Sequence, residues 1–139
     1  MNILFVCTGN TCRSPMAEGY LKSKGLPDVS VKSRGLGADG SPVSKNSALV
    51  MDEVGIDIKN HISAQITQED LMWADKIICL SVSHKEILEN FAADKSKLSL
   101  LGQGISDPFG GNTEIYRRCR DEIFAAVDSL IESGDFGNV

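Results

Sequence analysis

Long apolar runs are missing from this chain of 139 residues, and so is any excess of positive charge. The first apolar stretch, residues 2–6, is far shorter than the roughly 20 residues of a membrane-spanning helix, and no basic flank marks an export signal. Lys and Arg number 14 against 19 Asp and Glu, for a net charge of -5. Such a chain is a poor partner for nucleic acid or an anionic membrane. We therefore expect a cytoplasmic protein with neither partner.

Cysteine is also sparse, and the four present are Cys7, Cys12, Cys79 and Cys119. No two of them form a C-x-x-C pair and both histidines lie elsewhere in the sequence, which argues against a zinc site or another metal site. In a reducing compartment all four should be thiols. Cys79 is interpreted as a strand residue, and Cys119 as a core residue of the last helix.

Apolar runs alternate with helical patterns along the chain. Strands are expected at residues 2–6, 28–33, 76–80 and 97–101, and helices at 14–24, 44–54, 67–74, 83–91 and 113–133. Such alternation predicts parallel strands joined by crossovers, hence a doubly wound α/β sheet. The length suits a single domain spanning 1–139, and nothing demands an oligomer, so we expect a monomer.

In sheets of this kind ligands bind beyond the carboxyl ends of the strands, which here selects the loops 7–14, 33–44 and 102–112. The first loop must lead directly into a helix. Ser14 followed by Pro15 fits that start, with the serine as the cap and the proline at the first helical position.

A cysteine and an arginine separated by five residues, Cys7 and Arg13, frame this first loop. The loop can curl so that its backbone N–H groups face an anion, and Gly9 and Asn10 tolerate the positive φ angles that curling needs. Arg13 can bind two phosphoryl oxygens with its planar fork. The same donors are expected to lower the pKa of Cys7, with Ser14 donating to the thiolate. The loop thus predicts a nucleophile beneath a bound phosphoryl group.

The stretch from Val6 to Glu18, VCTGNTCRSPMAE, resembles the low-molecular-weight protein tyrosine phosphatase family. The resemblance continues in order at Ser33, at HISAQIT over 61–67 and at DPFGG over 107–111, so it covers nearly the whole chain. It implies a flavodoxin-like three-layer sandwich with a four-stranded parallel sheet and helices on both faces. It also implies phosphorylated protein substrates, inorganic phosphate as product or inhibitor, a phosphocysteine intermediate and no cofactor.

Roles for individual residues follow from the resemblance. Cys7 is then the nucleophile of the CX5R loop, Arg13 the phosphate clamp and Asp107 the general acid that later activates water. Pro108 holds Asp107 extended, although Asp-Pro before Gly-Gly read alone is only a turn. The substrate site is expected to include Thr8, Gly9, Asn10, Thr11, Cys12, Ser14 and Phe109. Tyrosines often stand just after Asp-Pro in the family, so Phe109 and Gly110 are a departure that leaves a more open wall.

Thr11 bears on the choice of substrate. Many tyrosine phosphatases of the family carry an aliphatic residue there, whereas the bacterial protein arginine phosphatases carry threonine and also resemble this chain in CTGNTCRSPMAE and DPFGG. A hydroxyl at this position can orient water or meet the guanidinium side of phosphoarginine, or the threonine simply packs in the loop. We place phosphoarginine slightly ahead of phosphotyrosine.

Four further residues lie outside the catalytic set: Cys12 has two interpretations, Ser33 and His61 are expected to support the phosphate loop, and His84 is expected at the surface. Cys12 either forms a reversible disulfide that protects Cys7 from oxidation or is a small residue facing the core. Ser33 and His61 match family positions that hold the phosphate loop, with Asn10 as their partner. His84 is interpreted as a surface residue at the start of a helix.

Two competing functions are weighed against a phosphatase. A thioredoxin-coupled arsenate reductase shares the fold and the C-x5-R loop, because arsenate mimics phosphate, but it relays oxidation through two further cysteines close together after the third strand. This chain has Cys79 there with no neighbouring cysteine. A catalytically silent phosphate-binding module conflicts with the complete set Cys7, Arg13, Ser14 and Asp107.

Overall fold

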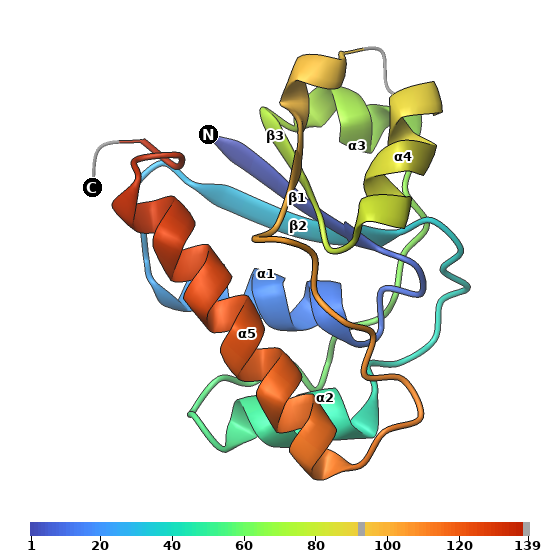
Figure 1. Ribbon diagram of the computed structural model, residues 1–139, viewed down its shortest axis with the longest axis vertical. Helices are drawn as coiled ribbons and strands as arrows, with labels where there is room; N and C mark the ends of the chain where they lie inside the picture. The colour runs from blue at the N-terminus through green and yellow to red at the C-terminus, as the bar shows by residue number, and fades with distance from the viewer. Residues whose placement is uncertain (92–93, 138–139) are drawn as a thin grey trace.

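The computed structural model describes residues 1–91 and 94–137 (Figure 1). Within these ranges four strands form one parallel sheet in the order β2-β1-β3-β4: β1 (Asn2–Cys7), β2 (Ser30–Gly35), β3 (Lys76–Cys79) and β4 (Leu98–Leu100). The same ranges contain the helices α1 (Arg13–Ser23), α2 (Lys45–Asp52), α3 (Gln68–Trp73), α4 (Val82–Phe91) and α5 (Thr113–Glu132), and the short 3-10 helix Lys95–Lys97.

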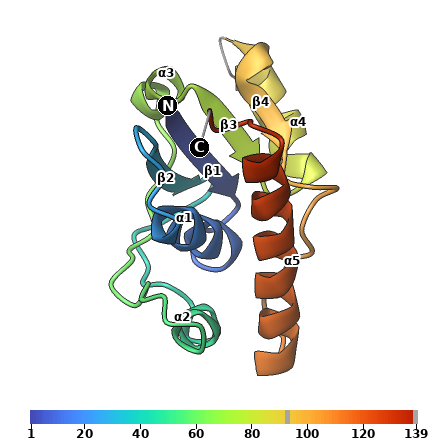
Figure 2. The same ribbon diagram turned by 90° about the vertical axis from the view of Figure 1, so that its left-hand side faces the viewer.

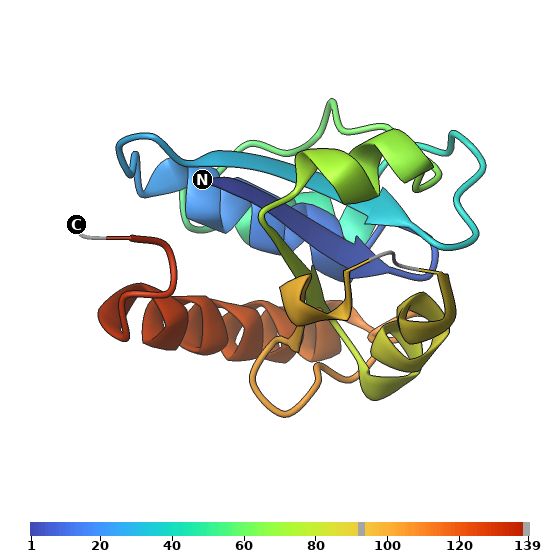
Figure 3. The same ribbon diagram turned by 90° about the horizontal axis from the view of Figure 1, so that it is seen from above.

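The sheet is the middle layer of a three-layer sandwich, with α1 and α5 on one face and α3 and α4 on the other (Figures 2 and 3). Strand β1 divides its side chains between the two layers because successive residues point to opposite faces. Ile3 and Phe5 pack with residues of α1 and α5, whereas Leu4 and Val6 pack with residues of α3 and α4. The expected flavodoxin-like architecture is therefore confirmed.

Helix and strand boundaries agree with the sequence to within two residues. The second strand shows the largest shift, running over Ser30–Gly35 rather than 28–33, because Asp28 has a φ of 60° and belongs to the turn before it. Ser44, Thr67 and Asn112 cap α2, α3 and α5 through their side chains.

Ser14 is not the expected cap of α1, and that prediction is wrong. The helix begins at Arg13 after Cys12, whose side chain makes no capping hydrogen bond, and Pro15 is its third residue. The hydroxyl of Ser14 is buried and engaged by Asn10 and Cys7 instead. A serine that serves the loop before the helix cannot also cap the helix.

The strand order reverses between β1 and β3, so the loops that follow these two strands diverge from one point at the carboxyl edge of the sheet. The β1–α1 loop, the β3–α4 connection at Leu80–Ser81 and the long segment 101–112 after β4 all lie on this edge. In the described part of the chain, no helix combines the length and apolar character needed to cross a membrane.

Candidate active site

The loop between β1 and α1 is curled, and its carbonyl groups are held from outside. Four of its carbonyl oxygens accept hydrogen bonds from neighbouring segments: Cys7 from Leu36 N at 3.0 Å, Thr8 from Gly37 N at 2.9 Å, Asn10 from His61 Nε2 at 3.0 Å and Thr11 from Ser44 N at 2.8 Å. Carbonyls fixed in this way leave amide N–H groups on the inner side of the curl, which is the arrangement of an anion nest. Asn10 has the expected positive φ, 56°, whereas Gly9 lies outside the positive-φ region.

Asn10 and Ser14 organise the interior of the loop around the sulfur of Cys7. Asn10 is fully buried, and its side chain donates from Nδ2 to Ser14 Oγ at 2.7 Å and accepts from Ala64 N at 3.0 Å. Ser14 Oγ lies 2.8 Å from Cys7 Sγ. Because Ser14 already accepts from Asn10, its own proton is left to donate to the sulfur. The backbone N–H of Asn10 also donates to Cys7 Sγ, at 3.2 Å.

The pKa of Cys7 does not shift in the expected direction. Burial raises the pKa of this thiol and outweighs the hydrogen bonds from Ser14 and Asn10 and the charge of Arg13, which act to lower it. The expectation of a lowered pKa is therefore wrong: it counted the donors around the sulfur but not the 3% exposure of the residue. The donors offset only part of the cost of forming a buried thiolate.

The three predicted catalytic residues, Cys7, Arg13 and Asp107, line one pocket with a volume of about 280 Å³. Arg13 is buried and donates from Nη1 to the carbonyl oxygen of Ile105 at 2.8 Å, while Nη2 lies 3.8 Å from Asp107 Oδ2. The side chain of Asp107 is 56% exposed, so the carboxyl group faces the pocket mouth rather than the core. The arginine thus bridges the nucleophile loop and the acid loop.

The residues that line this pocket include every one predicted for the substrate site except Ser14. Thr8, Gly9, Asn10, Thr11, Cys12 and Phe109 line the pocket. Asp107 Oδ1 accepts from the backbone amide of Phe109 at 3.0 Å, which holds the acid beside a phenylalanine that is 81% exposed. Ser14 lies beneath the pocket as a partner of Cys7 rather than on its wall.

Cys12 faces the core, as one of its two interpretations expected. The residue is 7% exposed and its Sγ lies 3.5 Å from the hydroxyl of Tyr116 on α5. On its other side Sγ lies 3.8 Å from the hydroxyl of Thr11. Cys12 and Cys7 are both free thiols, and the regulatory disulfide stays a prediction.

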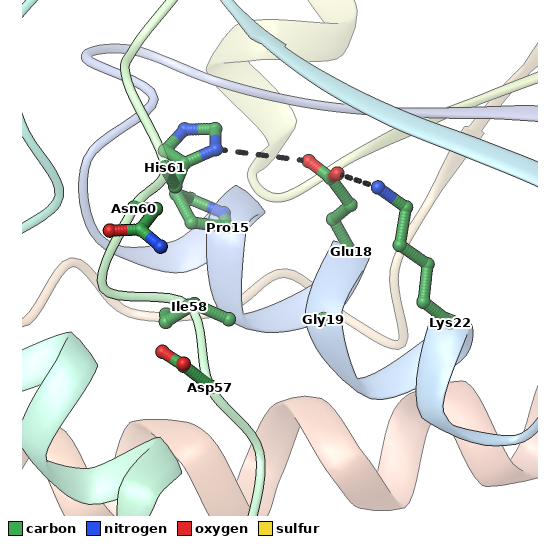
Figure 4. Close-up of a pocket in the computed structure, with 8 residues that line it drawn as sticks. All are labelled: Pro15, Glu18, Gly19, Lys22, Asp57, Ile58, Asn60 and His61. Carbon is green, nitrogen blue, oxygen red and sulfur yellow. Dashed lines mark hydrogen bonds and ion pairs between the residues drawn. The ribbon is translucent and has the colours of Figure 1, made fainter.

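His61 supports the loop from behind, beside a second pocket whose lining includes Pro15, Glu18 and Lys22 (Figure 4). Its Nε2 meets the Asn10 carbonyl, as expected, and its Nδ1 lies 4.0 Å from Glu18 Oε1. Ser33 was expected to bond Asn10 but donates to Glu18 instead. Glu18, which the sequence did not single out, therefore joins Ser33 to His61.

His84 is the side chain that sequence reasoning placed wrongly. It is 2% exposed rather than a surface residue, and its Nε2 lies 2.7 Å from Thr8 Oγ1. The topology could have identified this residue. His84 lies in the first turn of α4, directly after β3, and β3 is the neighbour of β1 at the point where the strand order reverses. Loops on both sides of that reversal border the site.

The remaining cysteines are unsuited to a redox relay. Cys79 ends β3 and is fully buried, Cys119 lies in α5 and is 5% exposed, and burial raises the pKa of each thiol to about 12. Neither lines the pocket that contains Cys7. Both match their interpretation as structural residues, and the arsenate reductase alternative loses its sequence and structural support.

Comparison with known proteins agrees with this geometry. Residues 2–135 match the family described as low molecular weight phosphotyrosine protein phosphatase. A protein-arginine-phosphatase of Geobacillus stearothermophilus is 45% identical, over 94% of this chain and 93% of that protein. The low molecular weight protein-tyrosine-phosphatase PtpB of Staphylococcus epidermidis is 36% identical, over 94% of this chain and 96% of its own. The structure of the YwlE arginine phosphatase from Geobacillus stearothermophilus superposes with a TM-score of 0.90 at 43% identity, covering 95% of this chain and 91% of that one. Taken with the loop that holds Cys7 and Arg13, these similarities make the chain a member of the low molecular weight protein tyrosine phosphatase family and a protein phosphatase of that type.

Proposed function

We propose that the chain hydrolyses phosphoarginine in proteins through a phosphocysteine intermediate, with Cys7, Arg13 and Asp107 as the catalytic residues. The observation that carries the proposal is that a buried thiol, a buried guanidinium and an exposed carboxyl group line a single pocket. Each of the three supplies a different part of phosphoryl transfer. The inward-facing amides of the loop add donors for the phosphoryl oxygens, and inorganic phosphate is the product that this site would release.

In the first step the Cys7 thiol gives its proton to a non-bridging oxygen of the phosphoryl dianion, Sγ attacks phosphorus, and the bond from phosphorus to the leaving group breaks. Arg13 and the loop amides hold the non-bridging oxygens, where negative charge is concentrated. Asp107 gives its proton to the departing nitrogen of phosphoarginine or oxygen of phosphotyrosine. The hydroxyl of Ser14, already 2.8 Å from Sγ, stabilises the sulfur when it carries charge.

In the second step Asp107 acts as the base. Its carboxylate takes a proton from water, the water oxygen bonds to phosphorus, and the sulfur–phosphorus bond breaks to release phosphate and regenerate Cys7. The exposure of Asp107 suits this exchange, because the group must reach both a leaving group and a water molecule from the mouth of the pocket. One carboxyl group therefore serves both steps in opposite protonation states.

Thr11 supports phosphoarginine ahead of phosphotyrosine. Thr11 lines the pocket, and in the described part of the chain its hydroxyl has one hydrogen-bond partner, the thiol of Cys12 at 3.8 Å, which is a weak one. The hydroxyl therefore has donor and acceptor capacity to offer a guanidinium group. Relatives named as arginine phosphatases stand among the most similar proteins, and relatives named as tyrosine phosphatases supply the second candidate.

The test is phosphate release from a phosphoarginine-containing protein and a phosphotyrosine peptide, measured side by side for wild type, Thr11→Ile and Thr11→Ser. We expect wild type to prefer phosphoarginine, Thr11→Ile to lose that preference by about tenfold or more, and Thr11→Ser, which keeps the hydroxyl, to retain it. Preference for phosphotyrosine in all three proteins would make this a tyrosine phosphatase in which Thr11 only packs. Release of phosphate from neither substrate would contradict the proposal.

A further inference from the structure

The pair formed by His84 and Thr8 has no part in the reaction described so far. His84 is the third residue of α4, and its ring is buried against the phosphate loop with Nε2 at 2.7 Å from Thr8 Oγ1. The other ring nitrogen, Nδ1, is buried and has no hydrogen-bond partner within residues 1–91 and 94–137. Because only one of the two ring nitrogens has a hydrogen-bond partner, the position of the ring proton can be inferred.

The empty Nδ1 fixes the direction of the hydrogen bond. A neutral imidazole carries one proton, on either nitrogen. With the proton on Nδ1, a buried N–H would have no acceptor, and orphaned buried N–H groups are rare in proteins. With the proton on Nε2, the ring donates to Thr8 Oγ1 and leaves only a lone pair at Nδ1. The second arrangement is the one that this geometry favours.

A charged ring is disfavoured at this position. The pKa of His84 is lowered to about 4, first by burial and then by the charge of Arg13, while Asp107 acts in the opposite direction. A second proton would also place an N–H on Nδ1 without an acceptor. At neutral pH the ring is therefore neutral and holds a single proton.

Once the Thr8 hydroxyl accepts a hydrogen bond from His84, its own proton is available for another hydrogen bond. Its side chain is exposed and lines the pocket with Cys7 and Arg13. Among the described residues, His84 is the one side chain that the Thr8 hydroxyl contacts by a hydrogen bond. Within residues 1–91 and 94–137 the hydroxyl proton thus has no acceptor, and it can be given to a ligand in the pocket.

We propose that His84 is a positioning residue that holds the Thr8 hydroxyl as a hydrogen-bond donor to a non-bridging oxygen of the bound phosphoryl group. The inference rests on the proposed function, since the phosphoryl group must sit above Cys7. Thr8 was already expected in the substrate site, and the new element is that His84 sets its hydroxyl as a donor to the phosphoryl group. A leucine would fill the buried space with no orphaned nitrogen, so the imidazole is better explained by its bond to Thr8 than by packing.

A double-mutant cycle tests the pair through two readouts: the dissociation constant of inorganic phosphate and kcat/KM for the substrate. The variants are Thr8→Val, His84→Leu and the combination of both. We expect each single variant to weaken phosphate binding and to lower kcat/KM by about tenfold, because a hydrogen bond to a charged oxygen is lost. The double variant should lose no more than either single variant, since both changes remove the same donor.

Two further variants separate positioning from packing. His84→Gln places an amide N–H₂ near the position of Nε2 and should restore most of the phosphate affinity. Val82→Ala changes an exposed residue on the same helical turn, 51% exposed, and should leave both readouts at wild-type values. A merely structural role for His84 would show no rescue by glutamine.

Losses that multiply in the double variant, or a His84→Leu protein with unchanged phosphate affinity, would overturn the inference. The phosphate readout requires no turnover, so it is independent of the proposed reaction. Coupled losses of phosphate affinity in a protein that hydrolyses neither phosphoarginine nor phosphotyrosine would refute the proposed function and leave the role of His84 standing.

Discussion

Asp107 performs the most demanding work of any single residue in this account, because one carboxyl group must serve as acid and then as base. Its backbone neighbour Pro108 is buried, and its Oδ1 is held by the amide of Phe109. Arg13 lies within 3.8 Å of Oδ2. These contacts hold the group at the pocket mouth without burying it.

We expect Asp107→Asn to slow the cleavage of aryl phosphates by about 10²- to 10⁴-fold, and most strongly for leaving groups of high pKa, because those need the proton most. The measurement is kcat/KM across a series of aryl phosphates, because this ratio reports cleavage of the ester and excludes the later hydrolysis of phosphocysteine. Asp52→Asn, which removes the same charge from an exposed position on α2, is the control. A loss that is equal for activated and poor leaving groups would argue against the acid role.

At the residue scale, the sequence predicted the chemistry of the site better than its electrostatics. Cys7 ends β1, while Arg13 and Asp107 follow β1 and β4 at the edge where a parallel sheet collects its ligands, so their convergence was predictable. The raised pKa of Cys7 was not, because the depth of burial of a sulfur depends on packing that spacing does not encode. The burial of His84 was missed for a similar reason, since a lone histidine at a helix start has no distinctive sequence pattern.

At the scale of elements, the site depends on how closely the end of β2 approaches the phosphate loop. Cys7 pairs with Gly35 in the register of β1 and β2. A Cβ added at Gly35 would lie 2.7 Å from the carbonyl oxygen of Thr8 and 3.0 Å from Asn10 Cβ. The first distance is too short for any side chain, so the glycine allows the two segments to meet.

Gly35→Ala should therefore destabilise the protein by about 1–3 kcal/mol and lower phosphatase activity, because the loop must shift to relieve the contact. Urea unfolding and phosphate release measure the two effects. Gly37→Ala is the matched control: an alanine Cβ there meets no atom within 4 Å. If Gly35→Ala had the same stability and activity as Gly37→Ala, the close approach of β2 would not constrain the phosphate loop.

Helix starts were predictable from the sequence where the capping side chain bonds its own helix, and not where that side chain bonds the catalytic loop. Ser44 and Thr67 were read correctly as starting residues because each bonds an amide of its own helix. Ser14 has the same hydroxyl chemistry, yet it is the second residue of α1 rather than its cap, and its hydroxyl contacts Cys7 and Asn10. A local sequence pattern predicts hydrogen bonds within one helix, but it does not predict the tertiary hydrogen bonds of a catalytic loop.

For the whole molecule, the buried neutral His84 predicts how stability depends on pH. In the unfolded chain its pKa is near the ordinary 6.5, and in the fold it is about 4. Between these values the unfolded chain binds a proton that the folded chain excludes, so the free energy of unfolding falls as the pH falls through this window. Above about pH 6.5 neither state is protonated and this contribution is constant.

Wild type should therefore lose on the order of 2 kcal/mol relative to His84→Gln as the pH falls from 6.5 to 4, as measured by urea unfolding at each pH. The glutamine variant keeps the same set of carboxyl groups, so the difference isolates His84. Parallel stability curves for the two proteins would show that His84 is not held neutral by the fold.

If Cys7 carries the phosphoryl group between the two steps, the phosphocysteine can be trapped during turnover. We would quench turnover with acid and identify the modified residue by mass spectrometry in wild type, Cys7→Ala and Cys12→Ala. We expect the added mass of one phosphoryl group on Cys7 in wild type and in Cys12→Ala, and neither modification nor turnover in Cys7→Ala. Turnover that persists in Cys7→Ala, or a phosphoryl group found on another residue, would contradict this role of Cys7.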